Sequence, residues 1–183
     1  MATNQIGLQP SPQPLLEVSP PAMSAPRRPL LEWRDQWTLD VGFMDEDHRA
    51  LAHRLNHIAR EWEVPQDGLA PPARHRAEAL EHLVEALEEL AVHVREHFER
   101  EEEVMRTVDY PEMVAHKGEH DLLLAEFRVT IRAIRDAGVA GLDRQTLESM
   151  KDWLMGHVLE VDRRLAEFLK NPPEAQVPPS APD

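Results

Sequence analysis

The chain has 183 residues, of which 42% are hydrophobic and 30% charged, and this composition fits one soluble globular domain with a sizeable core. Its 20 basic and 34 acidic residues give a net charge of −14, which would repel phosphate backbones and anionic headgroups, so we predict no nucleic-acid or membrane partner. There is no cysteine, which excludes disulfides, thiolate nucleophiles and sulfur-ligated metals. The N-terminus lacks the basic start and apolar block of a secretory signal, so a cytoplasmic protein is expected.

Proline divides the chain into three parts. Seven of the 16 prolines lie within residues 1–29, and five lie within 171–183. Such segments neither propagate a helix nor bury enough apolar surface to fold. We therefore predict disordered Pro-rich tails over 1–30 and 171–183, through which a protein partner could be tethered, and a folded unit over 31–170.

Within the folded unit, apolar residues recur at alternating steps of three and four, which is typical of helices that share a core. This rhythm predicts helices over 44–62, 73–107, 112–137 and 143–170. Gly138 and Gly141 would end the third helix, and Asp143 would cap the fourth. Short connections favour antiparallel neighbours, so the predicted fold is all-α, an up-down-up-down four-helix bundle. Trp33 and Trp37 would belong to an N-terminal arm packed across it.

Polar residues interrupt the core-facing rhythm. Inward positions that an ordinary bundle fills with Leu or Ile are occupied by His48, His97, Glu101, His116, His120 and His157, and Asp162 follows five residues after His157. Burying these groups without partners would cost several kcal/mol each, on the order of 2–7, and metal coordination satisfies many lone pairs at once. Residues four apart share one helix face, so each H-x-x-x-E or H-x-x-x-H pair can direct two ligand atoms at one point. A metal-free polar network would explain one such histidine, but not seven residues at one level of four helices.

The remaining histidines are interpreted differently. His53 and His57 also form an H-x-x-x-H pair, but each lies two positions from an inward residue, about 200° around the helix. We expect them on the surface, together with His75 and His82. His93 lies one turn before His97, and three roles stay open for it: a buried hydrogen-bonding neighbour, a partner that orients a metal-bound imidazole, or a substitute ligand.

The order of these residues resembles the hemerythrin family, in particular its single-domain bacterial branch. The resemblance covers about residues 31–168 and includes His48, then H-x-x-x-E, H-x-x-x-H and H-x-x-x-x-D, with Tyr110-Pro111 and Trp153-Leu154 as context. Three features depart from the family pattern. Asp47 replaces the usual glutamine, His93 stands where tyrosine is common, and the loop after the first helix looks long.

The resemblance implies two non-haem iron ions joined by an oxo or hydroxo bridge. His116, His120 and His157 would bind one ion, His48 and His97 the other, and Glu101 and Asp162 would bridge the two. Counting the bridges gives six ligands on one ion and five on the other, which leaves one position for dioxygen. The implied function is reversible dioxygen binding by a carrier, storage or delivery protein that is not an enzyme. By analogous position, a dry oxygen pocket would be lined by Leu51, Phe98, Trp153, Leu154 and Val158.

Three other functions fit the sequence less well. A di-iron oxidase or peroxidase of the ferritin-like kind uses Glu-x-x-His on two helices, and no histidine here has glutamate three residues before it. A module that senses oxygen, redox state or iron would normally be fused to an output domain, and here there are only the tails. A zinc-binding or metal-free structural bundle is disfavoured because zinc prefers four ligands.

Overall fold

The computed structural model describes residues 28–62, 73–138 and 141–172. The predicted tails lie outside the described residues except at their inner edges, and so does the loop over residues 63–72. The division into tails and folded unit therefore stays a prediction.

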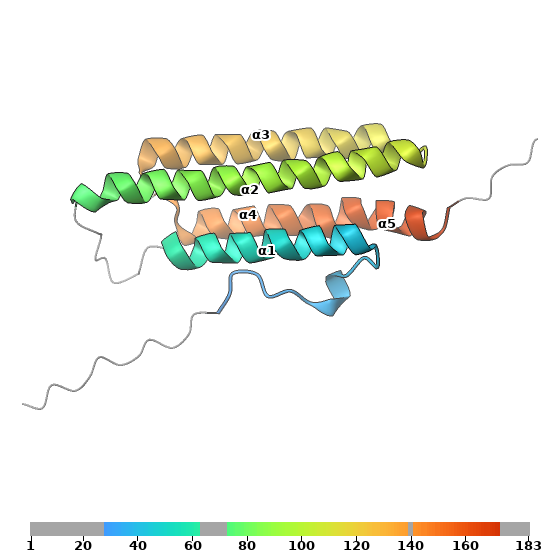
Figure 1. The fold of residues 1–183 in the computed structure, drawn as a ribbon, viewed down its shortest axis with the longest axis horizontal. Coiled ribbons are helices and arrows are strands. Elements are labelled where there is room, and N and C mark those ends of the chain that lie inside the picture. Colours follow the sequence, from blue (N-terminus) through green and yellow to red (C-terminus); the bar gives the residue numbers. More distant parts are fainter. Residues whose placement is uncertain (1–27, 63–72, 139–140, 173–183) are drawn as a thin grey trace, which may run out of the picture.

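Four long helical segments form the bundle. They are α1 (Gly42–Trp62), α2 (Ala73–Thr107), α3 (Met113–Ala137) and a composite segment made of α4 (Arg144–His157), the π-helical turn η3 (Val158–Asp162) and α5 (Arg163–Lys170). The segments run alternately in opposite directions along the long axis, which confirms the up-down-up-down bundle (Figure 1). Among the described residues there is no strand, and no helix is long and apolar enough to cross a membrane.

The helix ends follow from local chemistry. Gly138 ends α3 with a positive φ of 77°, a conformation that costs glycine little because it has no Cβ. Asp143 caps α4, since its side chain accepts the backbone N–H of Thr146 at 2.8 Å. The predicted signals at Gly138 and Asp143 are confirmed, whereas α3 has already ended before it reaches Gly141.

Two apolar clusters fill the core, one on each side of a polar layer. The larger contains Leu51, Leu87 and Leu154 and extends toward the loop that joins α3 to α4. The smaller contains Met44 and Met105 and lies toward the turn between α2 and α3. All seven predicted ligand residues are at most 5% exposed. The polar layer is therefore enclosed by apolar side chains above and below.

The N-terminal arm packs across the bundle as predicted. Leu31 is fixed to α1 by two hydrogen bonds: its N–H donates to Asn56 Oδ1 at 2.9 Å, and its carbonyl accepts from Asn56 Nδ2 at 2.7 Å. After the short 3-10 helix η1 (Asp35–Trp37), the Leu39 N–H donates to Asp45 Oδ1 at 2.7 Å. The Trp33 ring lies 6.4 Å from the ring of His48, so the arm covers the polar layer beside α1.

Candidate metal centre

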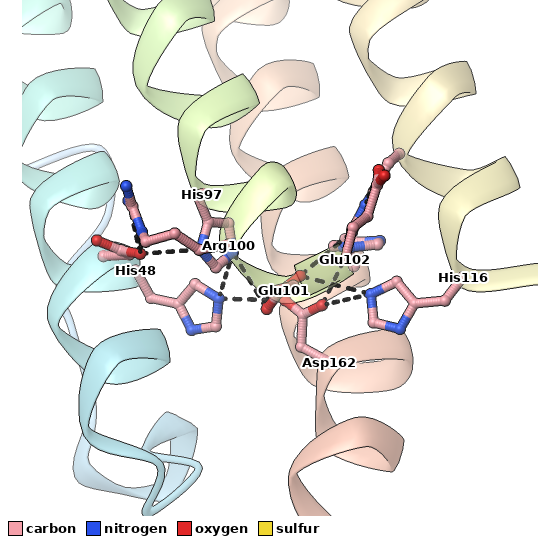
Figure 2. Close-up of polar contacts among 10 residues, drawn as sticks. His48, His97, Arg100, Glu101, Glu102, His116 and Asp162 are labelled. Atoms are coloured by element: carbon pink, nitrogen blue, oxygen red, sulfur yellow. Dashed lines mark hydrogen bonds and ion pairs between the residues drawn. The ribbon is translucent and has the colours of Figure 1, made fainter. Parts of the chain in front are cut away.

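The seven predicted ligand residues come together in one layer of the bundle. They form two groups whose donor atoms lie within 4.8 Å of one another: Glu101, His116, His120, His157 and Asp162 in one, and His48, His97, Glu101 and Asp162 in the other. We name these the three-histidine set and the two-histidine set. Figure 2 shows Glu101 and Asp162 in the middle, with His48 and His97 on one side and His116 on the other.

In the three-histidine set, imidazole nitrogens point at one oxygen of each carboxylate. Asp162 Oδ1 lies 3.0 Å from His157 Nε2 and 3.2 Å from His116 Nε2. Glu101 Oε2 lies 3.2 Å from His120 Nε2 and 3.5 Å from His116 Nε2. Three imidazoles and two carboxylate oxygens therefore surround one point.

The two-histidine set uses the other oxygen of each carboxylate. His48 Nε2 lies 3.1 Å from Asp162 Oδ2, and His97 Nε2 lies 3.4 Å from Glu101 Oε1. The two imidazole Nε2 atoms are themselves 3.1 Å apart. Because Glu101 and Asp162 each turn one oxygen to each set, both carboxylates are oriented to bridge two cations.

The π-helical turn η3 explains how Asp162 joins His157 in this layer. In a regular α-helix, residues five apart point about 140° away from each other. A π turn has i→i+5 hydrogen bonds and so brings residues five apart onto one face. Val158–Asp162 is such a turn, so the fourth helix is not the continuous α-helix predicted over 143–170. The five-residue ligand spacing was the sequence signal for this turn.

Two carboxylates outside the layer orient imidazoles of predicted ligand residues. His97 Nδ1 lies 3.2 Å from Asp47 Oδ2, and Arg100 donates to the same oxygen from Nε at 2.9 Å and from Nη2 at 2.8 Å. Asp47, noted as a departure from the family pattern, thus reaches from α1 across to α2 and holds the ring of His97.

On the opposite side, His120 Nδ1 lies 3.3 Å from Glu102 Oε1, which also accepts from Lys117 Nζ at 3.0 Å. Such partners hold the ring so that Nε2 faces the metal position. The sequence alone did not assign Glu102 this role. Its place next to Glu101, just off the core face, was the available signal.

Burial and mutual proximity push the pKa values of the two bridging carboxylates apart. Burial, reinforced by the neighbouring charge of Asp162, raises the pKa of Glu101 well above its usual value. Burial would also raise the pKa of Asp162, but the imidazoles of His157 and His116 outweigh it and hold the pKa well below the usual range. Two adjacent buried carboxylates ionise together only when positive charge is supplied. The layer therefore favours cations.

The pKa values of two imidazoles are also shifted in opposite directions. Burial lowers the pKa of His120 to about 2, and the charges of His157 and His116 add to this effect. For His116, burial also lowers the pKa, but the carboxylates of Asp162 and Glu101 outweigh burial and raise the pKa to about 9. A neutral ring such as that of His120 is the form that donates a lone pair to a metal, and a metal ion at the site would displace the proton that His116 otherwise holds.

The donor atoms fit a pair of metal ions because they contact one another as ion pairs at 3.0–3.5 Å and make no conventional hydrogen bonds. Among the described residues, the buried side-chain atoms without a hydrogen-bond partner include both oxygens of Glu101, both oxygens of Asp162, and Nε2 of His116, His120 and His157. Native proteins leave few buried polar atoms in this condition unless an ion or ligand satisfies them. Imidazole and carboxylate donors suit first-row transition metals such as iron.

Comparison with known proteins agrees with this geometry. Residues 39–169 match the family described as "Hemerythrin HHE cation binding domain". The chain belongs to the hemerythrin family. One similar protein is the bacteriohemerythrin of Stenotrophomonas maltophilia (strain R551-3), which is 26% identical over 77% of this chain and 82% of that protein. Another is the bacteriohemerythrin of Ralstonia nicotianae (strain ATCC BAA-1114 / GMI1000), which is 27% identical over 77% of this chain and 90% of that protein. The myohemerythrin of Theromyzon tessulatum is 28% identical over 72% of this chain and 87% of its own length.

A solved hemerythrin structure shares the fold. The crystal structure of a hemerythrin mutant superposes with a TM-score of 0.63 at 25% identity, and the match covers 78% of this chain and 98% of that one. This agreement confirms the predicted family and the predicted four-helix bundle.

Of the five residues predicted to line an oxygen pocket, Phe98 has ring contacts with three predicted ligand rings, those of His97, His120 and His157. Leu51, Phe98, Leu154 and Val158 are buried, whereas Trp153 is partly exposed. Phe98 stacks on the ligand ring of His120 at 3.8 Å between centroids. Their role in a pocket stays a prediction.

The other histidines divide as their helical positions indicated. His53, His57 and His82 are exposed, and the side chain of His75 lies outside the described part of the structure. His93 is half-buried and belongs to neither histidine set, and its Nδ1 lies 2.7 Å from the carbonyl oxygen of Glu89. This contact is that of a hydrogen-bonding neighbour within α2, the first of the three roles left open for His93, and any role toward the metal position stays a prediction.

Proposed function

We propose that this protein binds dioxygen reversibly at a non-haem di-iron centre and acts as an oxygen carrier, storage or delivery protein. The observation that carries the proposal is the sharing of Glu101 and Asp162 by two histidine sets of unequal size. The membership of the hemerythrin family supports the same conclusion.

The inequality of the sets supports a single vacancy for a ligand. With the two carboxylates shared, His116, His120 and His157 offer one ion five donors, while His48 and His97 offer the other only four. The ion held by His48 and His97 would therefore have one protein donor fewer than the other, and this difference would leave it a position for an added ligand. Two iron ions bound here would supply the reversible two-electron chemistry that dioxygen binding requires.

The chain's own residues would keep this site dry. The layer lies between two apolar clusters, and Leu51, Phe98 and Val158 next to the ligands are at most 3% exposed. Excluding water and free protons favours release of dioxygen as such rather than escape of a reduced oxygen species. Asp47 and Glu102 would hold two of the ligand rings in place.

The test is to purify the full chain with iron, measure the iron content, and record visible spectra without and with oxygen. We expect two irons per chain and a charge-transfer band that disappears on deoxygenation and returns on exposure to oxygen. A colourless protein, or one zinc per chain, would refute the proposal. Sustained consumption of a reductant with oxygen or peroxide, beyond two electrons per chain, would identify an oxidase or peroxidase instead.

A further inference from the structure

A surface groove between α2 and α3 gathers positive charge on a chain that is otherwise acidic. Its volume is about 310 Å³, and of its nine lining residues one is a glutamate and four are arginines: Arg95, Arg128, Arg132 and Arg135. The whole chain has a net charge of −14. The local excess of three positive charges is therefore the opposite of the chain's overall balance.

Two of the four arginines are not paired within the chain. Arg135 and Arg95 each contact a glutamate, at 2.7 Å and 3.7 Å respectively. The side chains of Arg128 and Arg132 are exposed, and neither has an ion pair or hydrogen bond among the described residues. These two residues lie four apart on α3, a spacing at which like charges destabilise a helix slightly. Both guanidinium groups are therefore available to an acidic ligand.

The groove also has an apolar lining. Val92 is 36% exposed, Leu124 and Ala91 are half-buried against the core, and Ile131 is buried. Apolar side chains at the centre of a contact with arginines around them are typical of protein–protein interfaces. A guanidinium group offers a planar set of donors that matches a carboxylate. This lining suits a segment that carries apolar side chains on one face and carboxylates beside them.

Other occupants fit the groove less well. Two-fold packing of two copies of the chain through this groove would place one set of arginines against the other. A nucleic acid is bound mainly through its phosphates, so it would make little use of the apolar lining and would be repelled by the acidic surface beyond the groove. A short acidic segment avoids most of that repulsion, because charges farther away than about 8 Å are screened at about 0.15 M ionic strength.

We propose that the α2–α3 groove docks an acidic amphipathic segment of a partner protein, with carboxylates on Arg128 and Arg132 and apolar side chains on Val92 and Leu124. Arginine clusters that recognise acidic motifs, and grooves that receive an amphipathic helix, are recurrent modes of peptide recognition. No lining residue belongs to either histidine set, so the inference goes beyond the proposed function and does not depend on it. The partner would nevertheless lie on α2 and α3, the two helices that supply four of the seven predicted ligand residues.

The experiment measures the binding of a designed acidic peptide to the full-length, metal-loaded protein by fluorescence anisotropy at about 0.15 M salt. The labelled peptide has about 18 residues, or about five helical turns, with leucines at steps of three and four and glutamates at most other positions. We expect saturable binding. Replacing both Arg128 and Arg132 by alanine should weaken it at least about tenfold, the factor for one lost charge-assisted hydrogen bond.

Matched variants separate the groove from the rest of the surface. Arg60→Ala combined with Arg106→Ala removes the same charge at exposed positions outside the groove and should change the affinity by less than about twofold. Val92→Glu places a carboxylate in the groove and should also weaken binding. Val108→Glu is its control, because Val108 is 37% exposed and lies outside the groove.

Three results would overturn the docking site. One is the absence of saturable binding by the unmodified protein, or equal affinity in the variant that lacks both Arg128 and Arg132. Another is equal affinity for a peptide of the same composition in shuffled order, which would exclude a role for the apolar lining. The third is tighter binding of a single-stranded oligonucleotide that is lost in the same double variant, which would identify a phosphate site instead of a protein-docking groove.

Discussion

Replacing Glu101 by methionine should stabilise the metal-free protein and destabilise the metal-loaded one. Glu101 is fully buried, both of its carboxylate oxygens lack a hydrogen-bond partner among the described residues, and their closest imidazole nitrogens are 3.2–3.5 Å away. Methionine has a similar length and an apolar, adaptable side chain. The substitution therefore removes a buried carboxyl group whose contacts with the imidazoles are ion pairs of 3.2–3.5 Å, too long and poorly aligned to count as hydrogen bonds, without leaving a large cavity.

The two effects have different magnitudes and opposite signs. A buried polar group without a partner costs about 1–3 kcal/mol, so the metal-free variant should gain about that much free energy of unfolding. In a chain of this size each kcal/mol raises Tm by about 2–4 °C. For the unmodified protein, metal at about 1,000 times its Kd adds about 4 kcal/mol. The variant should lose most of that gain, because Glu101 contributes to both histidine sets.

The assay is thermal and urea unfolding of the full chain, once with a chelator and once with ferrous iron under anaerobic conditions. Glu103→Met is the matched control, because Glu103 is exposed on the same helix and pairs with Arg106 at the surface. Its effect should stay within about 0.5 kcal/mol under both conditions. If Glu101→Met lowers the stability of the metal-free protein, the layer is a self-satisfied polar network, and the argument for a metal centre fails.

Two further substitutions probe the surroundings of the centre and the ends of its helices. Asp47→Ala removes the acceptor of His97 Nδ1 and should weaken metal binding about 10- to 100-fold, measured by competition with a chromophoric chelator, whereas Glu46→Ala at the exposed neighbouring position should have no effect. Asp143→Ala should lower Tm at pH 7, because the backbone N–H and hydroxyl of Thr146 hold the pKa of Asp143 below its ordinary 3.8. A depressed folded-state pKa stabilises above the unfolded value and loses that effect as the pH falls through the folded value, so the Tm difference between the two proteins should vanish in acid. A Tm difference that persists unchanged in acid would contradict this account of the cap.

Most of the fold followed from periodicity and end signals in the sequence. The predicted second helix, 73–107, agrees with α2 (Ala73–Thr107), and the start of the first differs from that of α1 by two residues. The reason is that a bundle buries one face of each helix, so the spacing of apolar residues along the sequence indicates which residues are buried. The seven predicted ligand residues could be singled out for the same reason, because they occupy core-facing positions.

Contacts between helices were less predictable. Asp47 lies on α1 but acts on His97 of α2, and it does so together with Arg100. Which surface charge meets which ligand ring depends on the rotation and offset of two packed helices, and sequence spacing within one helix does not contain this information. The same holds for the hydrogen bond from Trp153 on α4 to Glu126 on α3.

The π-helical turn shows where periodicity alone gives the wrong answer and chemistry corrects it. Reasoning at about 100° per residue predicts a continuous helix and turns Asp162 away from His157. Yet Asp162 is fully buried and lies 3.0 Å from His157 Nε2, which requires one extra residue in the intervening turn. The turn still keeps one face toward solvent, since Glu160 within Val158–Asp162 is exposed while Val158 and Asp162 are buried. Two polar residues spaced by five on a face where the other inward residues are spaced by three and four therefore predict the π turn itself. Bringing both side chains to one point of the core requires i→i+5 hydrogen bonds in place of the regular helical pattern.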